Sequence, residues 1–294
     1  MTQIKKPTAR PPPTYLEFQT SHYKFQMVVN RTLEPFHQFH FLVGDSLKPC
    51  LEGVIQLETS INNDRYKQHE YTGKLLKIDA LEECSVEDIT SDYTTKYSFG
   101  KEMLDAILFF INSQFIEIKT MSLNDTSYIP CNRDSEDTLD LLSYSIALYK
   151  KSWYEEKLNA YLLPKEKHDK YRTQVEIYAS KDTKQNISFN EFYHIILSNK
   201  PYPTNIISDN LEKYKEMYES SETLPEFFIE LSKSLRREQK CKFFKDWLFN
   251  FISSKIQIER MWYFDLFPKI KLINQTNMKP IKHRTRRNKN THNK

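Results

Sequence analysis

Glycine is scarce in this chain, with 4 residues among 294. Folds that hold nucleotide phosphates in a glycine-rich loop need several glycines at fixed spacing, so the scarcity argues against most of them. Cysteine is scarce as well, and Cys50, Cys84, Cys131 and Cys241 include no C-x-x-C pair. This spacing excludes a zinc ribbon and a dithiol redox motif. In a chain without a signal peptide, four such cysteines predict reduced thiols, most of them buried.

Long apolar runs are missing too. No stretch of 18 apolar residues occurs, which predicts that the chain has no transmembrane helix. No apolar segment follows the basic N-terminus, so no signal peptide is expected. We therefore expect an intracellular protein that is neither secreted nor membrane-bound. No metal site is expected, because His37 and His40 have only Glu34 and Asp45 as nearby carboxylates and no nearby cysteine.

Both ends of the chain are basic and lack acidic residues. Residues 1–13 hold three cations and four prolines, a composition that predicts disorder. Because residues 1–13 carry three positive charges and the last 16 residues carry seven, a total charge of +4 leaves −6 for residues 14–278. We predict that the C-terminal tail contacts nucleic-acid phosphates or serves as a nuclear-import signal; the alternative is a solvated tail. The cations expected to contact nucleic acid are Lys282, Arg284, Arg286, Arg287 and Lys289.

The first half of the chain predicts a sheet followed by a strand–helix–strand unit. Alternating apolar residues predict three strands, over 23–30, 39–44 and 50–59. The unit that follows is predicted as a strand, a helix and a strand, over 71–81, 100–111 and 115–123, with Ser98 as the N-cap of the helix. This order within about fifty residues is typical of a right-handed parallel crossover.

The second half predicts mainly helices. Asp137 is expected to cap a helix that runs through Leu148. Capping boxes are expected at Ser152–Glu155, Ser188–Glu191 and Thr223–Glu226. The strongest amphipathic pattern covers 242–256, where one stripe holds Phe243, Phe244, Trp247, Leu248, Phe251 and Ile252. That stripe predicts either core packing or a face for a protein partner.

The fold class that these patterns predict is α+β, with a mixed sheet and a helical C-terminal subdomain. We expect a disordered segment at 1–13, an α+β domain at 14–164, a helical subdomain at 165–272 and a disordered basic tail at 273–294.

The order of elements resembles the GNAT-type acetyltransferases over about residues 54–161. In that family, backbone N–H groups of a turn at a helix N-terminus hold the pyrophosphate of acetyl-CoA. A later strand is followed by an Asn, and a short helix carries a Tyr that protonates the leaving thiolate. YSFGKEML, Asn124 and WYEEKLNA resemble these segments. The family turn has Gln or Arg and two small residues where this chain has Thr95, Ser98 and Gly100, so two of the three positions differ.

The resemblance implies acetyl-CoA as the cofactor and an N-acetyltransferase as the activity. The implied cofactor-binding residues are Ser98, Phe99, Gly100, Lys101 and Asn124. Tyr154 is implied as the catalytic acid, and Glu82 or Glu83 as the base toward an amine. The other interpretation is that Trp153 and Tyr154 pack on a short helix and that both glutamates are solvated.

Two functional hypotheses follow. The bias toward Lys, Ile, Tyr, Phe and Asn, together with these segments, resembles proteins of large cytoplasmic DNA viruses, which implies the host cytoplasm, the nucleus or the virion as its location. The chain is then either a degenerate acetyltransferase-like enzyme or a non-enzymatic accessory or virion protein. In the second hypothesis the basic tail binds nucleic acid and the aromatic helix 242–256 binds a protein partner.

Overall fold

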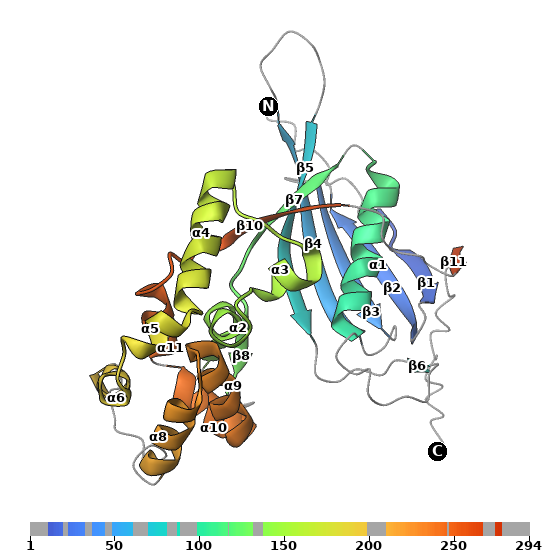
Figure 1. The fold of residues 1–294 in the computed structure, drawn as a ribbon. Coiled ribbons are helices and arrows are strands. Elements are labelled where there is room, and N and C mark those ends of the chain that lie inside the picture. The colour runs from blue at the N-terminus through green and yellow to red at the C-terminus, as the bar shows by residue number, and fades with distance from the viewer. Residues whose placement is uncertain are drawn as a thin grey trace, which may run out of the picture. The chain divides into compact units, whose positions relative to one another are not determined.

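The computed structural model describes residues 11–19, 23–32, 37–44, 49–60, 70–80, 87–88, 99–116, 118–131, 138–198, 210–245, 247–266 and 274–277. These residues fall into two compact units (Figure 1). Unit 1 comprises Met1–Met121 and Leu266–Lys294, and unit 2 comprises Ser122–Asp265. The predicted domains divide the chain elsewhere, at 164/165, so the segment before Pro164 lies in a different unit from the one expected.

Unit 1 is an antiparallel sheet with one helix. Its strands are β1 (Thr14–Gln19), β2 (Tyr23–Thr32), β3 (His37–Gly44), β4 (Pro49–Ser60), β5 (Glu70–Ala80), β6 (Glu87–Asp88) and β11 (Asn274–Asn277), and its helix is α1 (Phe99–Gln114). From β5 onward the strand order is β5-β4-β3-β2-β1-β11, and β6 pairs with β2. All of these pairings are antiparallel. The strands predicted over 23–30, 39–44 and 50–59 are confirmed as β2, β3 and β4.

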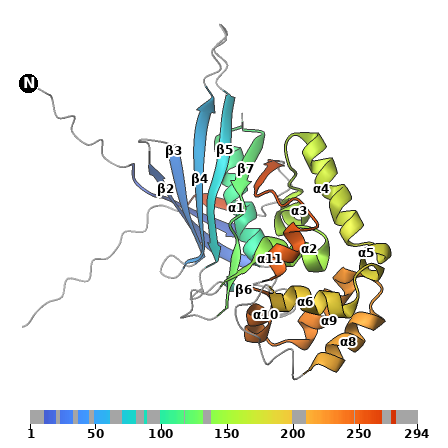
Figure 2. The ribbon, with the colours of Figure 1, turned by 90° about the vertical axis from the view of Figure 1, so that its left-hand side faces the viewer.

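Alternating side chains build the core of unit 1. Buried apolar residues alternate with half-exposed ones along β2, β3 and β4, so one face of the sheet is apolar. Helix α1 covers that face (Figures 1 and 2). Phe110 of α1 lies edge-on to Phe41, with the ring centroids 5.6 Å apart, and also contacts Phe39. The apolar side of α1, whose residues recur at helical spacing, therefore packs on the face of the sheet to which every second strand residue points.

The strand–helix–strand order is present as β5, α1 and β7 (Thr120–Asn124). The second strand starts at Thr120, later than the predicted Phe115, because α1 continues to Gln114. The beginning of β7 lies beside β5, since a Cβ added to Gly73 would lie 3.0 Å from the Cγ of Met121. The structure is thus α+β, as expected.

Gly44 is required at the end of β3. Its φ is +134°, and an added Cβ would lie 2.7 Å from the backbone nitrogen of Cys50. We expect Gly44→Ala to lower the free energy of unfolding by roughly 2 kcal/mol, because both the backbone conformation and the space disfavour a side chain. Gly73→Ala is the matched control, since its added Cβ meets only the flexible Met121 side chain. Chemical denaturation of both variants checks this, and equal losses would contradict it.

Strand β11 departs from the predicted disorder of residues 273–294. Its backbone pairs with β1 over four residues, from Gln19 with Asn274 to Leu16 with Asn277. The sheet therefore holds the chain up to Asn277, and residues 278–294 lie outside the described part.

Unit 2 is mainly helical. Its helices are α2 (Leu141–Tyr149), α3 (Trp153–Leu158), α4 (Lys165–Tyr178), α5 (Lys181–Gln185), α6 (Phe189–Ser198), α8 (Leu211–Ser220), α9 (Leu224–Ser234), α10 (Arg237–Phe244) and α11 (Leu248–Ser253). Its strands are β8 (Tyr128–Pro130), β9 (Thr138–Asp140) and β10 (Met261–Asp265), and β8 pairs with β9. Strand β10 was not predicted from the sequence. It lies in the segment expected to be a helical subdomain.

Two polar contacts explain why α2 belongs to unit 2. The hydroxyl groups of Tyr144 and Ser232 lie 2.6 Å apart, which joins α2 to α9. The buried hydroxyl of Tyr178 in α4 donates to the carbonyl of Ala147 at 3.1 Å. Sequence patterns around Pro164 carry no sign of these long-range contacts.

Aromatic side chains form the core of unit 2. The predicted helix over 242–256 is two helices, α10 and α11, and the chain leaves the helix between Phe244 and Leu248. The whole predicted stripe is buried, at 0–2% exposure. The indole of Trp247, for example, donates to the carbonyl of Phe243 at 2.5 Å. The expectation that this stripe presents a face to a partner is therefore wrong; it is core. Phe249 is the large apolar residue of α11 that is exposed.

Two of the predicted capping boxes are complete, one is half formed and one predicted cap is misplaced. The boxes at Ser152 and Ser188 are present, with Glu155 and Glu191 accepting from the cap N–H at 2.7 Å. At Thr223 the hydroxyl accepts from the Glu226 N–H at 3.4 Å, but the Glu226 carboxylate accepts from the N–H of Glu222 at 2.9 Å. Helix α2 is capped by Asp140 instead of Asp137, because residues 138–140 form β9 and the helix starts only at Leu141.

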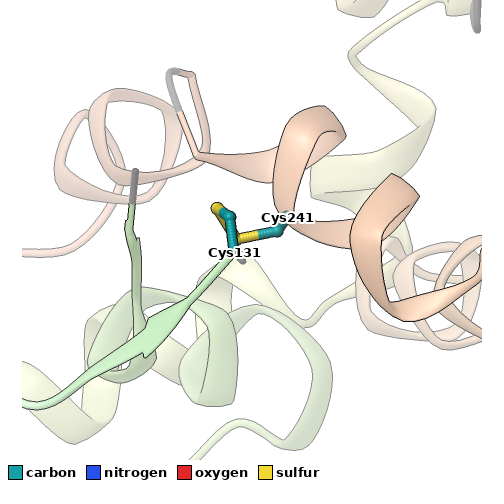
Figure 3. The surroundings of a disulfide bond; sticks show 2 residues. All are labelled: Cys131 and Cys241. Carbon is teal, nitrogen blue, oxygen red and sulfur yellow. A yellow bond between two sulfur atoms is a disulfide. The ribbon is translucent and has the colours of Figure 1, made fainter. Parts of the chain in front are cut away.

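Cys131 and Cys241 form a disulfide, so the prediction of reduced thiols is wrong for this pair. Their Cα atoms lie 5.2 Å apart, within the usual range for a disulfide. Figure 3 shows the bond between the residue that follows β8 and helix α10. The two cysteines are 110 residues apart in sequence, so no local pattern predicts the pair. Cys50 is buried and lies outside this disulfide.

Among the described residues, none of the helices combines the length and the apolar character needed to cross a membrane.

Candidate functional site

The predicted pyrophosphate turn lies at the start of α1. Phe99 and Gly100 are the first two residues of the helix, while Ser98 lies outside the described residues. The ammonium group of Lys101 binds the carboxylate of Asp105, one helical turn later. Burial raises the pKa of the Asp105 carboxyl, although the bond from Lys101 acts in the opposite direction. The positive charge expected to assist phosphate binding is therefore already compensated within α1.

The other predicted site residues are distributed differently. Glu82 and Glu83, the proposed bases, lie outside the described residues. Asn124 is exposed at the end of β7 and belongs to unit 2, whereas Gly100 and Lys101 belong to unit 1. The predicted site residues are thus divided between two units: Phe99, Gly100 and Lys101 lie in unit 1, and Asn124 and Tyr154 lie in unit 2.

Tyr154 lies in the first turn of α3 and packs against Trp153, with ring centroids 5.2 Å apart in a T-shaped arrangement. Burial raises the pKa of its phenol far above the ordinary value, and the charge of Asp125 adds to this increase. The phenol is consequently protonated throughout the physiological range. It is able to donate a proton or a hydrogen bond, but it does not act as a base.

Asp125 and Arg260 organise the corner where β7 ends. Asp125 is 1% exposed, and one of its carboxylate oxygens accepts from both the N–H (3.0 Å) and the hydroxyl of Ser127. The N–H of Asp125 donates to the carbonyl of Arg260 at 2.7 Å, and the Arg260 guanidinium donates back to the carbonyl of Asp125 at 2.9 Å. Arg260 also binds Asp140, the N-cap of α2, at 2.9 Å. This polar cluster ties together the ends of β7, α2 and β10.

A second buried cluster surrounds Glu155. Its carboxylate accepts from the Ser152 N–H, from the Tyr171 hydroxyl at 2.8 Å and from Arg172 at 3.3 Å. Burial, followed by the Glu155 charge, raises the pKa of the Tyr171 phenol well above its ordinary value. These contacts secure the N-cap of α3 and join α3 to α4, and Arg172 also donates to the carbonyl of Lys150, at the end of α2, at 2.9 Å. The role of this cluster is therefore explained by packing.

Sequence reasoning missed the cluster of Asp125, Ser127, Arg260 and Asp140. The contact of Asp125 with Ser127 was predictable, because Asp-x-Ser favours a turn in which the carboxylate accepts from the residue two positions later. Arg260 had none, because it is 135 residues away from Asp125.

We expect Asp125→Asn to increase stability at neutral pH. Burial raises the pKa of Asp125, so the folded state binds a proton more tightly than the unfolded state does. Stability is therefore lost as the pH rises from the unfolded pKa, about 4, through the higher folded pKa. The asparagine keeps the oxygen that accepts from Ser127 and carries no charge, so its advantage disappears at low pH.

Urea denaturation at about pH 4 and pH 7 checks this expectation. Asp140→Asn is the control, because Asp140 pairs with Arg260 and its replacement removes an ion pair. Asp125→Asn could instead lose as much stability at neutral pH as Asp140→Asn does. That result would show that the Asp125 charge is stabilising and would contradict the expectation.

The ring of His40 lies 2.6 Å from the carboxylate of Glu52 on the neighbouring strand. Within the described residues, no group of three or more His, Cys, Asp or Glu side chains is arranged to hold a metal ion.

Comparison with known proteins finds no matching family model, no similar curated protein and no similar solved structure.

Proposed function

We propose that this chain is a non-enzymatic accessory protein that binds nucleic acid through its basic C-terminal tail. The observation that carries this proposal is the separation of charge. Seven cations and no acidic residue occupy the last 16 residues, whereas residues 14–278 carry a net charge of −6. A segment without internal ion pairs is available to phosphates, which a protein binds largely by displacing counterions.

The attachment of the tail supports the proposal. Backbone pairing of β11 with β1 ends at Asn277, and the first cation of the tail, Lys279, follows two residues later. A basic segment fixed at its base to a sheet loses less freedom on binding than one attached through a long linker.

The contacts around the predicted cofactor turn favour binding over catalysis. Lys101 is paired with Asp105, and Tyr154 is half-buried and packs against Trp153. Both contacts are what the packing interpretation expects. The viral accessory or virion role stays part of this proposal, as does the intracellular location.

Two titrations of the full-length protein separate the hypotheses. We expect fluorescence anisotropy to detect binding of a labelled DNA duplex of about 30 base pairs at micromolar concentration and about 0.1 M salt. We expect calorimetry to detect no heat with acetyl-CoA at millimolar concentration. The reverse pattern, acetyl-CoA binding without DNA binding, would overturn the proposal.

An N-acetyltransferase remains the second candidate. It is favoured by the β5–α1–β7 order and by the position of Tyr154 in the same unit as Asn124. If acetyl-CoA binds, replacing Gly100 by a bulky residue is expected to abolish binding, because a side chain there obstructs close approach of a phosphate to the backbone. Binding that survives this change would place the cofactor elsewhere.

A further inference from the structure

The sheet of unit 1 has one face against α1, and no described helix of that unit lies on the opposite face (Figure 2). Along β2, β3 and β4, every second residue is half-buried or exposed and alternates with the buried residues that face α1. Successive side chains of a strand point to opposite sides of a sheet. The half-buried side chains of β1 to β5 therefore form the face opposite α1, which we call the open face.

An apolar strip crosses the open face from β1 to β5. Its members are Tyr15, Val28, Leu42, Val54 and Leu76. The strand register aligns them, since Tyr15 is opposite Val28 and Val28 is opposite Leu42. Leu42 is opposite Glu52, so Val54, two residues further along β4, is its diagonal neighbour on the same face. Leu76 lies beside Val54, where β5 bulges, and is 41% exposed.

The charges on the open face compensate each other. Glu17 binds the ammonium group of Lys24 at 2.7 Å, and the carboxylate of Glu52 lies 2.6 Å from the ring of His40. With Lys74, the described part of the face has two carboxylates and two ammonium groups, so its formal charge is zero when His40 is neutral. A face without net charge neither attracts a polyanion nor repels a second copy of itself.

The size of the open face fits a small interface between two copies. Five strands about 4.8 Å apart, each about six residues long at about 3.4 Å per residue, cover roughly 24 by 20 Å. Two such faces packed together remove about 1,000 Å² from solvent in total, which is near the lower limit for a specific interface. Sheets with apolar inner faces pack in this way, with their strands about 30° apart.

We propose that the open face is a homodimer interface, in which two copies pack strip against strip about a two-fold axis. A two-fold axis brings the same surface of each copy together, so a residue near the axis meets its own counterpart. Leu42 is the middle member of the strip and lies nearest the axis. Because the interface is small, we expect a dissociation constant in the micromolar range. This inference goes beyond the proposed function and does not depend on it.

Sedimentation velocity of the full-length chain at about 1 to 200 µM tests the proposal. We expect the unaltered protein to change from monomer to dimer over this range. Leu42→Lys and Leu42→Glu should each stay monomeric, because each places two like charges together at the axis. An equal mixture of the two variants should form a dimer again, because opposite charges then meet.

Gln38→Lys is the matched control. Gln38 is half-buried on the same face of the same strand, four residues from Leu42 and at the rim of the strip. A charge at the rim stays in water and contributes little, so this variant should dimerise like the unaltered protein. Thermal unfolding of each variant separates lost association from lost folding, and a dimer in the mixture shows that both Leu42 variants are folded.

Three results would overturn the proposal. The first is an unaltered protein that is monomeric at every concentration. The second is a dimer that neither Leu42→Lys nor Leu42→Glu weakens, which would place its interface elsewhere. The third is a monomer that binds phosphatidylcholine vesicles and loses this binding in Leu42→Lys, because a lipid surface would then be the occupant of the open face.

Discussion

Removing residues 279–294 is expected to weaken binding to duplex DNA by roughly a hundredfold or more at about 0.1 M salt. The physical reason is the loss of seven cations from a segment without acidic residues. Each phosphate that a cation neutralises contributes about 0.9 to the salt slope, so the slope should fall by up to about 6. Fluorescence anisotropy at four or five salt concentrations measures both quantities.

Two controls give this result its meaning. Replacing the seven cations by glutamine should reproduce the deletion, because the proposal depends on charge and not on chain length. Replacing Lys165, Lys181 and Lys233, which are exposed in unit 2, should leave the salt slope unchanged. Equal effects from the unit 2 variant and from a tail variant with three replacements would indicate a general charge effect.

Reducing the Cys131–Cys241 disulfide is expected to lower the free energy of unfolding of unit 2 by about 2–5 kcal/mol. The bond joins residues 110 positions apart. A cross-link over such a loop restricts the unfolded chain strongly, and in the chain-entropy model a loop of about 100 residues contributes nearly 5 kcal/mol. Both cysteines are buried, at 5% and 2% exposure, so their replacement also removes packing.

Denaturation with and without dithiothreitol measures this effect. The double variant C131A/C241A should be at least as unstable as the reduced protein, because it also loses packing, and it should not respond to the reductant. Cys50→Ala is the control, since Cys50 is a buried cysteine outside the disulfide and its variant should still respond. An unaltered protein whose stability is the same with and without reductant would contradict the structural role of the disulfide.

Local patterns predicted local structure well. The three strands of the meander and the capping boxes at Ser152 and Ser188 depend on residues close in sequence, where alternation and spacing carry the information. The errors arose where distant residues decide. The pairing of Cys131 with Cys241, the contact of Tyr144 with Ser232 and the unit boundary all depend on residues that no local window contains.

The predicted site shows the same contrast between features set by neighbouring residues and features set by distant ones. The position of the helix at Gly100 and that of Tyr154 in a short helix were predictable from spacing. The pairing of Lys101 with Asp105 is local too, because their i,i+4 spacing on a helix favours an ion pair. The link from Asp125 through Arg260 to Asp140 required the fold. The periodicity of the aromatic stripe around Trp247 fits both a core helix and a binding face. Only the structure distinguishes them, because it shows that these side chains are buried in the core.

The most direct test of the proposed function is the salt slope of the unaltered full-length protein on duplex DNA. Because the tail alone offers seven cations, we expect log K to fall with log salt with a slope of about −6 or steeper. A slope near zero, or no binding at about 50 mM salt, would contradict the claim that this chain binds nucleic acid through its basic C-terminal tail.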